Sequence, residues 1–166
     1  MISTYGTITM DPTGEVIAGS RITITFTYTV GSSGLKAGGS LRIRTPNDGW
    51  DPPLAHRKQL PKRIENQPFT LTDSTYCTHN RSNLSASLSG TAAATLELFA
   101  ESGVGPLSQF MVATLCGGNL IQGDSISIVY GDRTWGEDGV AVQKVAPTPD
   151  RFVAHVDIEG NGEFRP

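Results

Sequence analysis

One stretch of the chain alternates between apolar and polar residues without a break. Between Ser20 and Val30, aliphatic and aromatic residues occupy every second position from Ile22 onward, and threonines fill the positions between them. Successive side chains of a β-strand point to opposite faces, so this stretch has one apolar face and one face of threonine hydroxyls. β-Branched and aromatic residues also favour strands. We predict a long strand here, with its apolar face packed against a second layer.

The same period of two recurs along the chain, between turns rich in glycine and proline. Further strands are predicted at 4–10, 40–45, 84–89, 92–100, 108–116, 125–130, 140–145 and 152–158. The segment 108–116 is apolar on both faces, which is typical of a central strand. About ten short strands with little helical pattern indicate an all-β fold. We predict a two-sheet antiparallel sandwich, immunoglobulin-like or jelly-roll, that spans residues 1–166 as a single domain.

The segment 46–68 shows no periodicity, and it is longer than most connections between strands. It contains four basic residues that we take as candidate interaction residues, Arg57, Lys58, Lys62 and Arg63. Such a run can contact an anionic polysaccharide, a phosphate-bearing surface or an acidic loop of a neighbouring subunit. The alternative is an ordinary solvated face.

The overall charge bears on the class of partner. The chain has 13 basic and 16 acidic residues, and its net charge of −3 argues against a nucleic-acid binder. No apolar run is long enough for a membrane helix. The first residues lack the basic and apolar regions of a signal peptide, so we expect an extracellular protein if such a peptide has been removed, and otherwise a cytoplasmic one.

The residues that most often carry chemistry form no recognisable motif. Cys77 and Cys116 are far apart in the sequence, and a disulfide between them and two buried thiols are both open alternatives. The three histidines, His56, His79 and His155, make no metal-binding pair, and the chain has no G-x-S-x-G elbow. We therefore predict no metal, no cofactor and no enzymatic activity.

Three aromatic residues are candidate ligand-binding residues. Trp50 and Trp135 lie in predicted loops, and Tyr130 ends a predicted strand. Together they can form a flat apolar platform for a sugar ring, if the loops meet at one end of the sandwich. The alternative is that each tryptophan closes one end of the core, with its indole N–H bonded to a partner.

Five segments in order carry a resemblance to a known family. They are Phe26-Thr-Tyr-Thr-Val-Gly31, Gly38-Gly39-Ser-Leu-Arg-Ile43, Trp50-Asp-Pro-Pro53, Gly123-Asp-Ser-Ile-Ser-Ile-Val-Tyr-Gly-Asp-Arg133 and Phe152-Val-Ala-His-Val-Asp157. In that order they resemble the N-terminal β-sandwich region of large bacterial proteins of a domain-of-unknown-function family, which carry a PHP-like metal-hydrolase domain afterwards. The segment Thr134-Trp-Gly-Glu-Asp138 departs from the glycine-rich turn of that family. The resemblance implies an accessory or scaffold domain and carries over no catalytic residue.

From these observations we expect a non-catalytic structural or interaction module. It would associate with copies of itself through sheet edges or loops, because edge strands carry unpaired backbone groups. A catalytic domain in cis is a further expected partner. The alternative is a carbohydrate-binding accessory domain of a larger bacterial hydrolase, with a glycan as its ligand.

Overall fold

The computed structural model describes residues 3–46, 49–55, 82–90, 93–102, 109–134, 136–144 and 151–166. These residues form ten strands and no helix. The strands are β1 (Thr7–Asp11), β2 (Arg21–Ile22), β3 (Ile24–Thr29), β4 (Ser40–Arg44), β5 (Leu84–Ser89), β6 (Thr95–Ser102), β7 (Gln109–Gly117), β8 (Ser125–Tyr130), β9 (Val140–Ala141) and β10 (Val153–Asp157).

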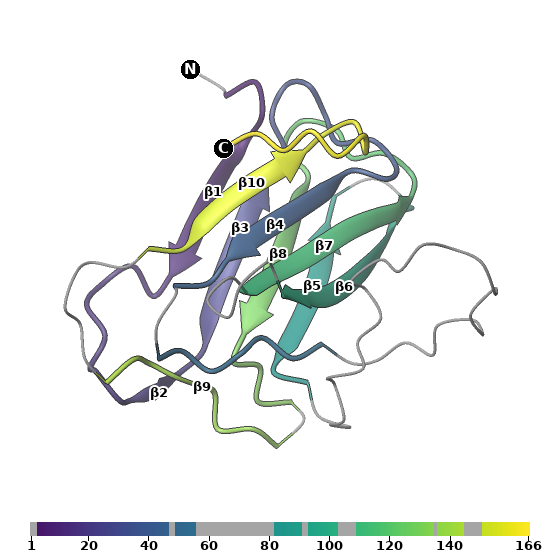
Figure 1. The fold of residues 1–166 in the computed structure, drawn as a ribbon. Coiled ribbons are helices and arrows are strands. Elements are labelled where there is room, and N and C mark those ends of the chain that lie inside the picture. The colour runs from purple at the N-terminus through teal and green to yellow at the C-terminus, as the bar shows by residue number, and fades with distance from the viewer. Residues whose placement is uncertain are drawn as a thin grey trace.

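Two four-stranded antiparallel sheets pack face to face (Figure 1). The first sheet has the order β1-β3-β8-β5 and the second has the order β10-β4-β7-β6, while β2 and β9 form a small separate ladder. Buried residues of both sheets make one core, which includes Phe26, Leu41, Ile43, Met111, Leu115, Ile126 and Ile128. The predicted all-β sandwich is therefore confirmed.

The strand order relates this sandwich to known β topologies. The sheet β1-β3-β8-β5 follows the A-B-E-D order of an immunoglobulin domain, and β10 lies beside β4 as strand F lies beside strand C. The pairs β3–β8 and β4–β7 are nested along the chain. The consecutive strands β3 and β4 lie in different sheets, and each pairs within its own sheet with one of the later consecutive strands, β8 or β7. In an immunoglobulin domain strand G covers the outer edge of strand F. The described residues form no named strand at that edge of β10.

The alternation in the sequence produces the buried face that it predicts. In β3 the residues Ile24, Phe26 and Tyr28 are buried, and in β8 the same holds for every second residue from Ile126 to Tyr130. The polar positions face outward, where the hydroxyls of Thr27 and Ser127 lie 3.3 Å apart across the two strands. Period-two patterning thus sets which face of the first sheet enters the core.

Two predicted strands are much shorter than expected. The stretch predicted to run unbroken to Val30 is interrupted at Thr23, whose hydroxyl donates to the carbonyl of Gly131 at 2.8 Å. The two residues before this break leave the first sheet and pair with β9 instead. The strand predicted at 140–145 is β9, which has two residues. A side-chain hydrogen bond and a local partner strand, which the alternation does not encode, set these limits.

Candidate binding groove

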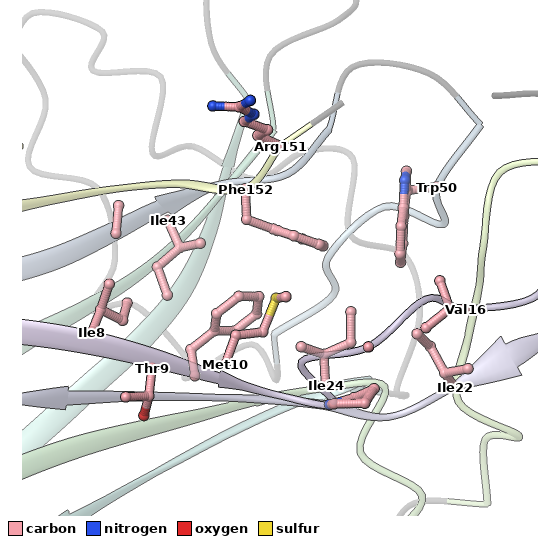
Figure 2. A pocket seen from close by; sticks show the side chains of 14 residues that line it. Ile8, Thr9, Met10, Val16, Ile22, Ile24, Ile43, Trp50, Arg151 and Phe152 are labelled. Carbon is pink, nitrogen blue, oxygen red and sulfur yellow. The ribbon is translucent and has the colours of Figure 1, made fainter. Parts of the chain in front are cut away.

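An apolar groove of about 440 Å³ opens between the two sheets, beside the edge strands β1 and β10 (Figure 2). Its lining residues are Ile8, Thr9, Met10, Pro12, Gly14, Val16, Ile22, Ile24, Phe26, Ile43, Trp50, Arg151, Phe152 and Ala154. The volume lies within the range of small-molecule pockets. Aliphatic and aromatic groups dominate the lining, so the groove suits a hydrocarbon surface better than a charged or strongly polar one.

The position of the groove follows from the sheet order. β1 is the edge of the first sheet and β10 is the edge of the second. The inward side chains of these edges, Ile8 and Met10 from β1 and Ala154 from β10, form its two walls. Ile24, Phe26 and Ile43 come from the neighbouring core strands. The groove is therefore a continuation of the core that no further strand covers among the described residues.

The backbone of β1 presents hydrogen-bonding groups along the open edge. Val30 directs both its N–H and its carbonyl toward the β8 side, to Asp124 and Gly123. Because backbone direction alternates along a strand, Thr29 and Thr27 face β1, and the register pairs them with Thr7 and Thr9. The intervening residues of β1, Ile8 and Met10, therefore direct their N–H and carbonyl groups outward, away from β3.

The backbone of β10 presents the same kind of edge. Val156 exchanges two hydrogen bonds of 2.8 Å with Arg165, on the side away from β4. Alternation then directs the N–H and carbonyl of Ala154 to that outer side, while those of His155 face β4. Four residues near the groove thus combine an inward apolar side chain with outward backbone groups, namely Ile8, Met10, Ala154 and Val156.

The C-terminal residues close one end of this opening. Arg165 pairs with Val156 of β10, and its guanidinium carbon lies 5.5 Å from the centre of the Tyr5 ring. Arg165 therefore reaches from the edge of β10 to the segment that leads into β1. Two residues before Val156, at Ala154, no described residue is paired with the outer edge of β10.

Two of the three predicted ligand-binding aromatics meet, but inside the molecule. The rings of Trp50 and Tyr130 are 6.4 Å apart, and both lie against Phe152. Tyr130 is 0% exposed, and its hydroxyl donates to the carbonyl of Asp51. Trp50 is half-buried and its Nε1 finds no acceptor among the described residues. The third aromatic, Trp135, lies outside the described residues.

The remaining predicted site residues are distributed as follows. Arg57, Lys58, Lys62 and Arg63 lie outside the described residues, and so does Cys77. Cys116 is exposed on β7. The alternative of two buried thiols is therefore wrong for Cys116, whose side chain reaches the surface of β7. The predicted disulfide with Cys77 and the predicted basic contact surface stay predictions.

Histidine, cysteine and carboxylate side chains do not gather into a metal-binding group within the described ranges. Those ranges also contain no helix long and apolar enough to cross a membrane. Several of the described carboxylates accept hydrogen bonds from the backbone and so have structural roles. Asp51, for example, accepts a hydrogen bond of 2.9 Å from the backbone N–H of Ala141 and pairs with Arg21 at 3.4 Å.

The sequence pattern does not identify the groove residues Ile8, Met10, Phe152 and Ala154 as a site. One signal was present, because the segment Thr7–Met10 is uncharged and rich in β-branched residues. Charges that usually protect a sheet edge are absent from this segment, and β1 carries its one charged residue, Asp11, at its end. The position of that strand at an edge depends on long-range pairing, which the sequence pattern does not reveal.

Comparison of the chain with protein-family models, with curated proteins and with solved structures finds no match. The class of the protein therefore rests on its own structure, which is an all-β sandwich with an apolar groove at one open edge. The resemblance to the N-terminal region of PHP-associated proteins stays a prediction.

Two buried tyrosines predict a loss of stability in alkaline solution. Burial raises the pKa of Tyr28 from 10.0 to about 12. Burial, followed by the negative charge of Asp51, also raises the pKa of Tyr130. A phenol with a raised pKa in the folded state stabilises the fold below its unfolded pKa and loses that contribution as pH rises. We expect the free energy of unfolding to fall between pH 10 and about 12.

Urea denaturation at a series of pH values measures this effect. The variant Tyr28→Phe has no phenol at this position, so its stability should fall less steeply over the same interval. An equal slope for the variant and the original protein would contradict the role assigned to Tyr28.

Proposed function

We propose that this protein is a non-catalytic structural and interaction module that self-associates through its sheet edges. The observation that carries the proposal is the edge of β1, where Ile8 and Met10 direct unpaired backbone groups outward and no described strand covers them. Exposed edges of this kind add a strand from another molecule. Ile8, 39% exposed, and Tyr5, 36% exposed, contribute apolar surface beside the same edge.

A two-fold axis beside β1 gives the simplest arrangement. Antiparallel pairing of two β1 strands can place Ile8 of one copy opposite Met10 of the other, and both residues direct their backbone groups outward. In this register Thr9 faces Thr9 and Asp11 faces Thr7, so no like charges oppose each other. The two first sheets then continue through the interface as one sheet, which is an isologous contact.

The variant Ile8→Lys should abolish self-association. An inward-pointing charge on an edge strand disfavours pairing with another copy, while the long lysine side chain can keep its ammonium group in water within the monomer. Size exclusion with light scattering over a series of protein concentrations measures the mass. We expect the original protein to exceed the monomer mass of 17.7 kDa as concentration rises, and the variant to remain at that mass.

A matched control is Ile121→Lys, which introduces the same charge at an isoleucine that is 59% exposed and belongs to no strand. This control should associate as the original protein does. A monomer at every concentration for the original protein, or equal association by Ile8→Lys, would refute the proposed contact.

The carbohydrate-binding alternative has weaker support from the described residues. The platform needs exposed rings, whereas Tyr130 is fully buried and the ring of Trp50 packs against Phe152 at 5.2 Å between centroids. Trp135 alone would then have to supply the flat surface. The open edge of β1 favours protein association over glycan binding.

A further inference from the structure

We propose that the groove between β1 and β10 binds one extended segment of a different protein, as an added β-strand antiparallel to β10. This site goes beyond the self-association through β1 and does not require it. Both contacts use the outward backbone groups of Ile8 and Met10, so one molecule makes only one of them at a time. The bound segment would carry apolar, preferably branched, side chains at alternate positions. Those side chains would enter the groove, while its backbone would bond to the two flanking edges.

The backbone groups at the opening identify the ligand as a polypeptide strand. Ala154 on one side and Ile8 and Met10 on the other direct N–H and carbonyl groups outward, and the side chains of all three line the groove. A hydrocarbon ligand would fill the apolar space but would cover these polar groups without bonding to them. Unpaired backbone groups away from water are costly, so a strand that bonds to them fits the site better.

The chain itself shows the direction of the added strand. Arg165 is already paired with Val156 in the antiparallel sense, next to the level of Ala154. The same pairing continued by two residues along β10 would reach Ala154. Figure 1 shows β1 and β10 running in opposite directions, so a strand antiparallel to β10 runs parallel to β1.

The lining specifies the side chains of the partner. Figure 2 shows the side chains of Ile8, Met10, Ile24 and Phe152 directed toward a common space, with the guanidinium of Arg151 and the indole nitrogen of Trp50 turned away from it. A charged side chain that entered this space would lose its hydration without gaining a partner among the residues that face it. The inward positions of the partner strand are therefore apolar, and its outward positions tolerate polar residues.

A second copy of this chain is a poorer occupant of the groove. Each named strand of the described residues is already paired within its own sandwich, including β1 near the N-terminus and β10 near the C-terminus. A copy would have to break one of these ladders in order to insert a strand. A segment of another protein that is extended and unpaired has no such cost.

The direct test is amide hydrogen exchange by NMR of the full chain in the presence of a synthetic peptide. In this peptide valine alternates with threonine over seven residues, with a lysine at each end for solubility. The amides of Ile8, Met10 and Ala154 should exchange at least about tenfold more slowly when the peptide is bound. Thr9 and His155 already face β3 and β4, so their exchange should not change.

Two variants at one position test separately the backbone group and the groove volume at Ala154. Ala154→Pro removes the outward N–H, which an edge strand tolerates because this group bonds to no other strand of the sheet. Ala154→Leu keeps that N–H and fills part of the groove. Each variant should weaken peptide binding roughly tenfold or more, which corresponds to about 1.4 kcal/mol. Thermal melting followed by circular dichroism shows whether each variant is folded, and Ala154→Leu suffices if Ala154→Pro is not.

The controls decide between the possible occupants. A peptide of the same composition with its valines contiguous should not slow these amides, and decanoate should not produce the alternating protection. Protection by decanoate alone, equal protection by both peptides, or no protection by the alternating peptide would overturn the proposal. Light scattering measures self-association separately. If the protein stays monomeric and the peptide slows exchange at Ile8, Met10 and Ala154, the groove site is supported and the proposed β1 contact is refuted.

Discussion

Replacing Asp157 with alanine should lower the free energy of unfolding by about 2–4 kcal/mol, because one buried carboxylate organises the whole turn after β10. Asp157 is 3% exposed. Its Oδ1 accepts from the backbone N–H groups of Glu159, Gly160 and Asn161 at 3.2, 2.8 and 3.3 Å. Its Oδ2 accepts from Gly162 at 2.7 Å. Alanine would leave all four donors without this acceptor.

This turn also determines how the chain returns to the open edge. It reverses the direction of the backbone after β10, so that Arg165 pairs with Val156. Gly160 suits the turn because its φ is +72°, and a Cβ there would lie 2.6 Å from the backbone of Gly38. The loss of the carboxylate should therefore also release Arg165 from the edge of β10.

Chemical denaturation of Asp157→Ala measures the loss, with Asp157→Asn and Glu163→Ala for comparison. Asparagine retains one side-chain acceptor, so it should cost about half as much or less. Glu163→Ala removes only an exposed pair with Arg165 at 3.7 Å and should change stability by less than about 1 kcal/mol. A loss for Asp157→Ala no greater than that for Glu163→Ala would show that the four contacts contribute little.

The sequence pattern predicts the individual strands of this fold better than their arrangement. The alternation of Ile126, Ile128 and Tyr130 predicts β8 and its buried face, because burial of a period-two face is a local property. The same alternation assigns Tyr130 to the core side, which is where its ring lies. The prediction that Tyr130 belongs to a surface platform conflicts with its position in this pattern, because its ring is buried.

The edges of the sandwich were not predictable in this way. Whether β1 is central or at an edge depends on which strand pairs with it, and its partner β3 lies more than a dozen residues away in the sequence. The groove combines β1 with residues near β10, at the opposite end of the chain. Ile8 and Ala154 therefore become one site only through long-range pairing, which the periodicity of either segment does not contain.

Replacing Phe152 with alanine should lower the free energy of unfolding by about 3 kcal/mol and enlarge the groove. The ring of Phe152 lies 5.0 Å from that of Phe26, 5.2 Å from Trp50 and 6.3 Å from Tyr130. It therefore joins the first sheet to the residues just before β10. Truncation removes three aromatic contacts and leaves a space that continues into the groove, where partial collapse or entry of water can reduce the cost.

Urea denaturation gives the change in stability, and Ile17→Ala is a suitable control because that isoleucine is 80% exposed. Phe152→Leu should recover more than half of the loss, since leucine refills much of the apolar space without restoring the ring contacts. Equal stability of Phe152→Ala and Ile17→Ala would show that the aromatic cluster does not hold the two sheets together. A large loss would instead show that Phe152, which lines the groove, also stabilises the sandwich. A strand that binds the folded protein at the groove should likewise raise the melting temperature.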